Sequence, residues 1–138
     1  MHHWSFLLLG NFMSIPDYQT LMLPLLKIAA ERETRIPDVE ERVADEFGLT
    51  LEERNELLPS GRQKVLHNRM HWAKFYMSKA GLVESPRRGR FIATAEGRAL
   101  LARNLQRIDV ELLHAYPSFQ EFYRSSASST ATTRASSP

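Results

Sequence analysis

Residues 62–81, RQKVLHNRMHWAKFYMSKAG, constrain the fold of this chain more than any other stretch. At 100° per residue, a helix over this segment has one apolar side, as expected of a helix packed on a core. Its apolar positions are Leu66, Met70, Ala73, Tyr76, Met77 and Ala80, with Val65 and Trp72 at the edge. The opposite side is basic and polar and has no acid: Lys64, His67, His71, Lys74 and Ser78, flanked by Asn68 and Lys79. The segment therefore predicts one helix with a buried face and a basic face, ended by Gly81.

Arg69 is the exception in this pattern, because it falls near the middle of the apolar side. An unpaired charge there would be costly, so we expect Arg69 to form a salt bridge with an acid of the preceding helix.

Two short β-prone runs, LVES and RFIAT, follow the helix directly and are joined by PRRG. Pro86 and Gly89 favour a turn, so the pair predicts a β-hairpin whose tip carries Arg87, Arg88 and Arg90. A solvated turn with no partner is the plain alternative for these arginines.

Helical patterns lie on both sides of this unit. An apolar repeat from Tyr18 to Ala29 predicts a first helix, with Pro24 as a kink or near its first turn. A brief extended piece at Arg35 and Ile36 leads to a second, acidic helix that Gly48 ends. A small helix or turn is predicted at 50–58, where Thr50 and Glu53 have the capping-box spacing, and a further helix at 95–108, capped by Thr94. The order helix, extended piece, helix, helix, hairpin, helix predicts a mainly α winged helix-turn-helix.

Composition sets the outer limits. With 138 residues, 43% hydrophobic and 25% charged, the chain fits one soluble domain plus tails. The absence of cysteine excludes disulfides, thiolate zinc sites and cysteine nucleophiles, and fits a reducing, cytoplasmic setting. We expect four parts: a loose extension (1–12), the winged-helix domain (13–108), a short helical or linker segment (109–123) and a disordered Ser/Thr-rich tail (124–138).

The net charge of +2 conceals a strong asymmetry. Residues 1–60 contain five Lys and Arg against eleven Asp and Glu, whereas residues 61–138 contain thirteen against five. A one-sided basic segment attracts a polyanion, and nucleic acid is the first candidate. The alternative is that acidic helices pair with basic ones inside the fold.

Beyond these patterns, the residues resemble the amino-terminal domain of Mrr-type restriction system proteins, which act on modified DNA. The resemblance runs from about Ile15 to Phe122 and rests on LPSGRQ, NR, WA and KAGL, followed by RRGRF and TAEG. It implies a winged-helix domain that recognises double-stranded DNA and, in the family, precedes a nuclease. The nuclease motif places Asp or Glu two positions before Lys to hold Mg²⁺. No Asp or Glu in this chain is followed two positions later by Lys. We therefore expect a DNA-binding domain without a nuclease or catalytic residues.

Candidate DNA-binding residues follow from the two basic elements. On the helix they are Lys64, His67, Asn68, His71 and Lys74, and at the hairpin, for phosphates, Arg87, Arg88 and Arg90. Asn68 could pair with adenine, and Phe75 could touch a base methyl group unless it packs on the hairpin or on a second subunit. His67 and His71 have the i, i+4 spacing of zinc sites, but Asn68 replaces the needed Glu and no third ligand is apparent, so we expect no metal and no cofactor. Other functions left open are a protein-docking or dimerisation module and a free-standing regulator of transcription. A homodimer and a separately encoded nuclease are partners left open in the same way.

Overall fold

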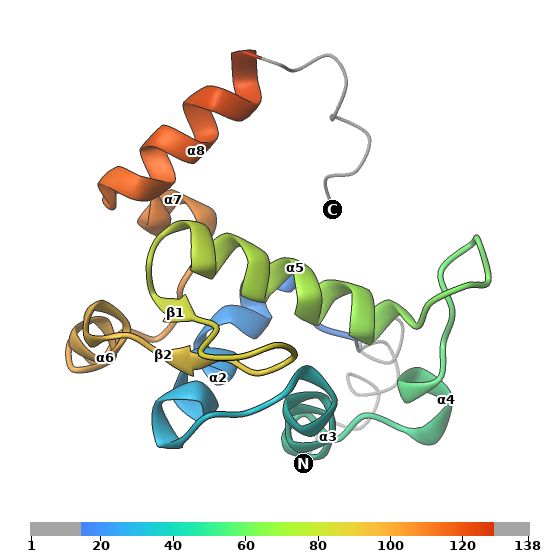
Figure 1. The fold of residues 1–138 in the computed structure, drawn as a ribbon. Coiled ribbons are helices and arrows are strands. Elements are labelled where there is room, and N and C mark those ends of the chain that lie inside the picture. The colour runs from blue at the N-terminus through green and yellow to red at the C-terminus, as the bar shows by residue number, and fades with distance from the viewer. Residues whose placement is uncertain (1–14, 129–138) are drawn as a thin grey trace.

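A computed structural model describes residues 15–128 of the chain (Figure 1). The expected loose extension at 1–12 and residues 129–138 of the expected tail lie outside the described part. The elements in order are α2 (Tyr18–Glu31), α3 (Ile36–Glu46), α4 (Leu51–Arg54), α5 (Val65–Lys79), β1 (Val83–Glu84), β2 (Ile92–Ala93), α6 (Ala95–Leu101), α7 (Val110–Leu113) and α8 (Pro117–Ser128). The predicted fold class is confirmed: the chain is mainly helical with a small antiparallel sheet, consistent with a winged helix-turn-helix.

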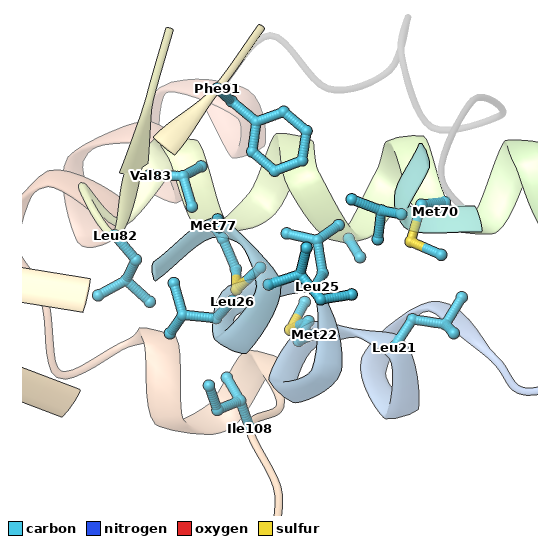
Figure 2. Close-up of a cluster of buried hydrophobic side chains, with 14 of the residues drawn as sticks. Leu21, Met22, Leu25, Leu26, Met70, Met77, Leu82, Val83, Phe91 and Ile108 are labelled. Carbon is cyan, nitrogen blue, oxygen red and sulfur yellow. The ribbon is translucent and has the colours of Figure 1, made fainter. Parts of the chain in front are cut away.

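The core forms where α2 packs along α5 (Figure 2). Leu21, Met22, Leu25 and Leu26 of α2 are fully buried, as the apolar repeat of the sequence predicts. The predicted apolar side of α5 faces them, and its buried members are Val65, Leu66, Met70, Ala73 and Met77. Pro24 lies in the interior of α2 rather than in its first turn.

Side-chain caps fix the starts of α2, α4 and α6. The Asp17 carboxylate accepts a hydrogen bond from the backbone N–H of Thr20 at 2.8 Å, and this bond holds the pKa of Asp17 below its usual value. The predicted capping box of α4 is present, because Thr50 and Glu53 each bond the other's backbone N–H. Thr94 caps α6, also as predicted. These local signals lie three residues apart, which is why the sequence reveals them.

The hairpin is confirmed, with Val83 opposite Ala93 and Glu84 opposite Ile92. The loop between α2 and α3 adds a short antiparallel bridge to this hairpin, because Thr34 and Phe91 exchange two backbone hydrogen bonds of 2.9 Å. The expected extended piece at Arg35 and Ile36 is thus displaced, because Ile36 already begins α3, with Pro37 in its first turn. The Thr34 bridge ties the α2–α3 loop to the hairpin.

Arg69 does not pair with an acid of α3, contrary to expectation. Within residues 15–128, its guanidinium donates to the backbone carbonyls of Ile15 and Pro16, at 2.9 and 3.4 Å. Carbonyl oxygens satisfy the charge without a buried carboxylate, and the contact holds the residues before α2 against α5.

The C-terminal part differs from the sequence reading. The helix expected at 95–108 ends at Leu101, and Asn104 takes a left-handed conformation (φ 54°). The segment 109–123, expected to be helical or a linker, contains α7 and the start of α8, and Leu113 and Phe119 are fully buried in the core. Because α8 continues to Ser128, it passes the expected boundary at 123. Residues 105–122 therefore contribute to the packed core, and α8 continues beyond them to Ser128.

Candidate nucleic-acid interface

The outer face of α5 carries Asn68 and His71, as the helical periodicity predicts, and Lys64 lies at the N-cap just before the helix. Lys64 and His71 are exposed, and Asn68 is half-buried. The amide nitrogen of Asn68 donates to Oε1 of Gln63 at 3.1 Å, which holds the side chain in one orientation. One N–H and the carbonyl oxygen of Asn68 are then available to a partner, the pair of groups that suits adenine.

His67 lies at the edge of this face and is engaged by α3. Its Nδ1 contacts Oε2 of Glu40, whose side chain is 18% exposed. Because a carboxylate only accepts hydrogen bonds, Nδ1 carries the proton, and Nε2 is the nitrogen left for another contact. His67 is thus a fixed, partly covered member of the predicted set.

The rings of His71 and His67 pack edge to face, with their centroids 4.5 Å apart. Partial desolvation, followed by the neighbouring His67 and Lys74, lowers the pKa of His71 below its usual value. The lowered pKa favours the neutral form of His71 at pH 7, in which the ring can both donate and accept hydrogen bonds.

Lys74 links the helix to the hairpin. Its Nζ lies 5.4 Å from the centre of the Phe91 ring, within the range of a cation–π contact. Phe91 is buried at the start of the returning strand, beside α5 (Figure 2). This contact and the bridge between Phe91 and Thr34 fix the hairpin beside the outer face of α5.

The hairpin tip, residues 85–90, is held in shape by its own backbone and by one hydroxyl. The N–H of Arg90 donates to the carbonyl of Arg87 at 3.0 Å, and Gly89 takes a positive φ of 74° to close the turn. The Ser85 hydroxyl lies 3.0 Å from the Arg87 carbonyl and 2.7 Å from the Arg90 carbonyl, and so braces both sides of the turn.

The three arginines of the tip do not share one environment. Nε of Arg87 lies 2.8 Å from Oε2 of Glu33, and Nε of Arg90 lies 3.8 Å from the same oxygen. Arg88 is exposed and forms no ion pair with any residue between 15 and 128. Arg88 is therefore the tip cation most open to an external anion.

Phe75 is 39% exposed on the outer face, and within residues 15–128 it packs on α8 rather than on the hairpin. Its ring meets those of Trp72 on α5 and Phe122 on α8, with centroids 5.6 Å away in both cases. Lys79 lies over the rings of both Phe75 and Phe122. Phe75 thus joins α8 to α5.

Two acids that the sequence reading missed, Glu33 and Glu40, contact the basic elements from the α2–α3 region. Glu40 contacts His67 and Glu33 contacts Arg87, so some acidic and basic side chains do pair with one another inside the fold, which was the alternative to binding a polyanion. Their partners lie 54 and 27 residues away, so local spacing gives no signal for them. The only available hint is that these acids lie in the negatively charged first part of the chain.

Other kinds of site find little support in residues 15–128. No three His, Cys, Asp or Glu side chains of this region come together to hold a metal ion. A cleft of about 370 Å³ between α2 and α3 contains none of the predicted site residues; it is lined by Leu23, Pro24, Lys27, Ile28, Glu31, Arg42, Glu46 and Phe47. No helix in the described region has the length and apolar character needed to cross a membrane.

Comparison with known proteins gives the same family as the residues. The model of the Mrr N-terminal domain matches residues 18–103. Over 87 residues, the chain is 34% identical to the type IV methyl-directed restriction enzyme EcoKMrr of Escherichia coli (strain K12). This match covers 62% of the chain and 28% of the length of that enzyme. No solved structure matches the chain. The chain belongs to the Mrr N-terminal domain family.

Proposed function

We propose that this chain is a recognition domain of a restriction system that binds double-stranded DNA. The observation that carries the proposal is the acid-free outer face of α5 lying beside an arginine-rich hairpin tip, with Phe91 fixing one to the other. A helix of this kind fits the major groove, and a basic hairpin beside it reaches the phosphates.

In this arrangement the two elements have different tasks. Lys64, Lys74 and the hairpin arginines neutralise phosphates and give sequence-independent affinity. Asn68, oriented by Gln63, and neutral His71 contact base edges and give sequence preference. We assign binding rather than cleavage to these 138 residues, because no Asp or Glu precedes Lys by two positions.

The phosphate role is tested with Arg88→Ala in a duplex-binding titration at several salt concentrations. Arg88→Ala should weaken binding to all duplexes alike and reduce the salt slope by about 1. Arg103→Ala, an exposed residue beyond α6, removes the same charge and should leave binding nearly unchanged. Equal losses in the two variants would show that only net charge matters and would contradict the proposed interface.

The base-reading role is tested with Asn68→Ala against a pool of duplexes that includes methylated and unmethylated versions of each sequence. The relative's description as methyl-directed motivates the methylated arm. Asn68→Ala should cost about 1–3 kcal/mol at the preferred sequence and flatten the ranking of sequences. If it lowers thermal stability but leaves the ranking unchanged, Asn68 does not read bases.

A further inference from the structure

Glu33 has an unusual place among the acids of residues 15–128, because a single carboxylate oxygen contacts two arginines of the hairpin tip. The Glu33 side chain is 25% exposed, whereas that of Arg87 is 71% exposed. The acid thus lies more deeply than the guanidinium that it holds.

The backbone on both sides of this contact is fixed. Thr34, the next residue after Glu33, is 7% exposed and is bridged to Phe91 by two hydrogen bonds. Ser85 braces the carbonyls of Arg87 and Arg90 from the other side. Glu33 therefore meets the tip in a defined geometry rather than as a chance surface pair.

The contact uses only one of the five N–H groups of Arg87, the one on Nε. The four N–H groups on the two terminal nitrogens have no acceptor among the described residues, and two parallel N–H groups match a phosphate. A free arginine loses side-chain entropy when it binds, and a guanidinium already held on its Nε side loses less.

We propose that Glu33 is a positioning residue for DNA binding: its carboxylate holds Arg87 so that the terminal N–H groups of this arginine are presented to a phosphate. This inference rests on the proposed function. It predicts the opposite of simple electrostatics, in which removal of a negative charge near the tip strengthens binding to a polyanion.

The test is Glu33→Gln, which keeps the shape of the side chain and removes its charge. Duplex affinity should fall about two- to tenfold, equally for all sequences. Glu31→Gln is the matched control, because it makes the same change in net charge. The Glu31 carboxylate pairs with Arg42, at 2.7 Å, and not with an arginine of the hairpin. The control should bind as well as the natural protein or slightly better.

A double-mutant cycle separates positioning from a general structural effect. In an Arg87→Ala background, Glu33→Gln should no longer weaken binding, because the residue through which it acts is gone. The NMR signal of the Arg87 Nε–H should shift and exchange faster in Glu33→Gln, while the amide of Phe91 stays protected by its bridge to Thr34.

The outcomes distinguish this inference from the proposed function. If the natural protein binds duplexes but Glu33→Gln binds equally well or better, the carboxylate only competes with phosphate, and the positioning role is wrong. A loss that persists in the Arg87→Ala background would also overturn it. If the natural protein shows no salt-dependent duplex binding, both the proposed function and this inference are wrong.

Discussion

Gly97, in the first turn of α6, offers the sharpest test of the packing beneath the hairpin. A Cβ atom at this position would lie 2.3 Å from the carbonyl oxygen of Leu82 and 3.1 Å from a methyl carbon of Leu26. Carbon and oxygen in contact are about 3.3 Å apart, so α6 or the start of the hairpin must move by about 1 Å. The Leu82 carbonyl also accepts the N–H of Thr94 at 2.9 Å, and this bond would be strained by the shift.

The magnitude follows from opposing effects. Alanine in place of glycine within a helix gains about 0.5–1 kcal/mol. Overpacking costs about 1–3 kcal/mol, and the strained hydrogen bond about 1 kcal/mol more. Gly97→Ala should therefore lose about 1–3 kcal/mol and lower Tm by about 5 °C or more in a thermal melt followed by circular dichroism.

Ala99→Gly is the control for helix propensity in α6, because Ala99 is exposed. It should lose about 1 kcal/mol, which would show that α6 itself favours alanine. If Gly97→Ala leaves Tm unchanged or raises it, the close approach of α6 to Leu82 is wrong.

Two further predictions concern the ends of the packed unit. Phe119→Ala removes a fully buried ring of α8 and should lower the free energy of unfolding in urea by about 3–5 kcal/mol. Tyr123 lies on the same helix but is 51% exposed, so Tyr123→Ala should cost about 1 kcal/mol or less. Small losses in both variants would mean that α8 is not part of the core. Asp17→Ala should lose about 1 kcal/mol at pH 7. Because the N–H of Thr20 lowers the folded pKa of Asp17, this stabilisation is present above the unfolded pKa of about 3.9 and disappears as pH falls through the folded value. The Tm values of the two proteins, plotted against pH, should therefore converge in acid. A gap in Tm that stays constant with pH would contradict the cap.

Much of the fold is predictable from sequence because its signals are local. The stripe of α5, the cap at Thr94, the capping box at Thr50 and the glycine turn of the hairpin each depend on residues within a few positions of one another. The extent of α8 was missed, because serines beyond Tyr123 hide the helix and its stability comes from burial of Phe119 against the rest of the core.

The candidate site divides in the same way. Helical periodicity identifies which side chains of α5 face outward, but it cannot show that Glu40 engages His67 or that Glu33 holds Arg87. These pairs exist only after the α2–α3 loop has bridged to the hairpin through Thr34. Arg69 was misassigned for a related reason, since backbone carbonyls far along the chain satisfy its charge.

The central claim is that the outer face of α5 and the hairpin tip together form a DNA-binding surface. Its most direct test is the dissociation constant of the unaltered protein for a duplex, measured between 50 and 200 mM salt. If three to five phosphates are neutralised by the cations of this surface, the dissociation constant should rise by about 40- to 500-fold over that range. A dissociation constant that does not change with salt, or the absence of binding at 50 mM, would contradict the claim.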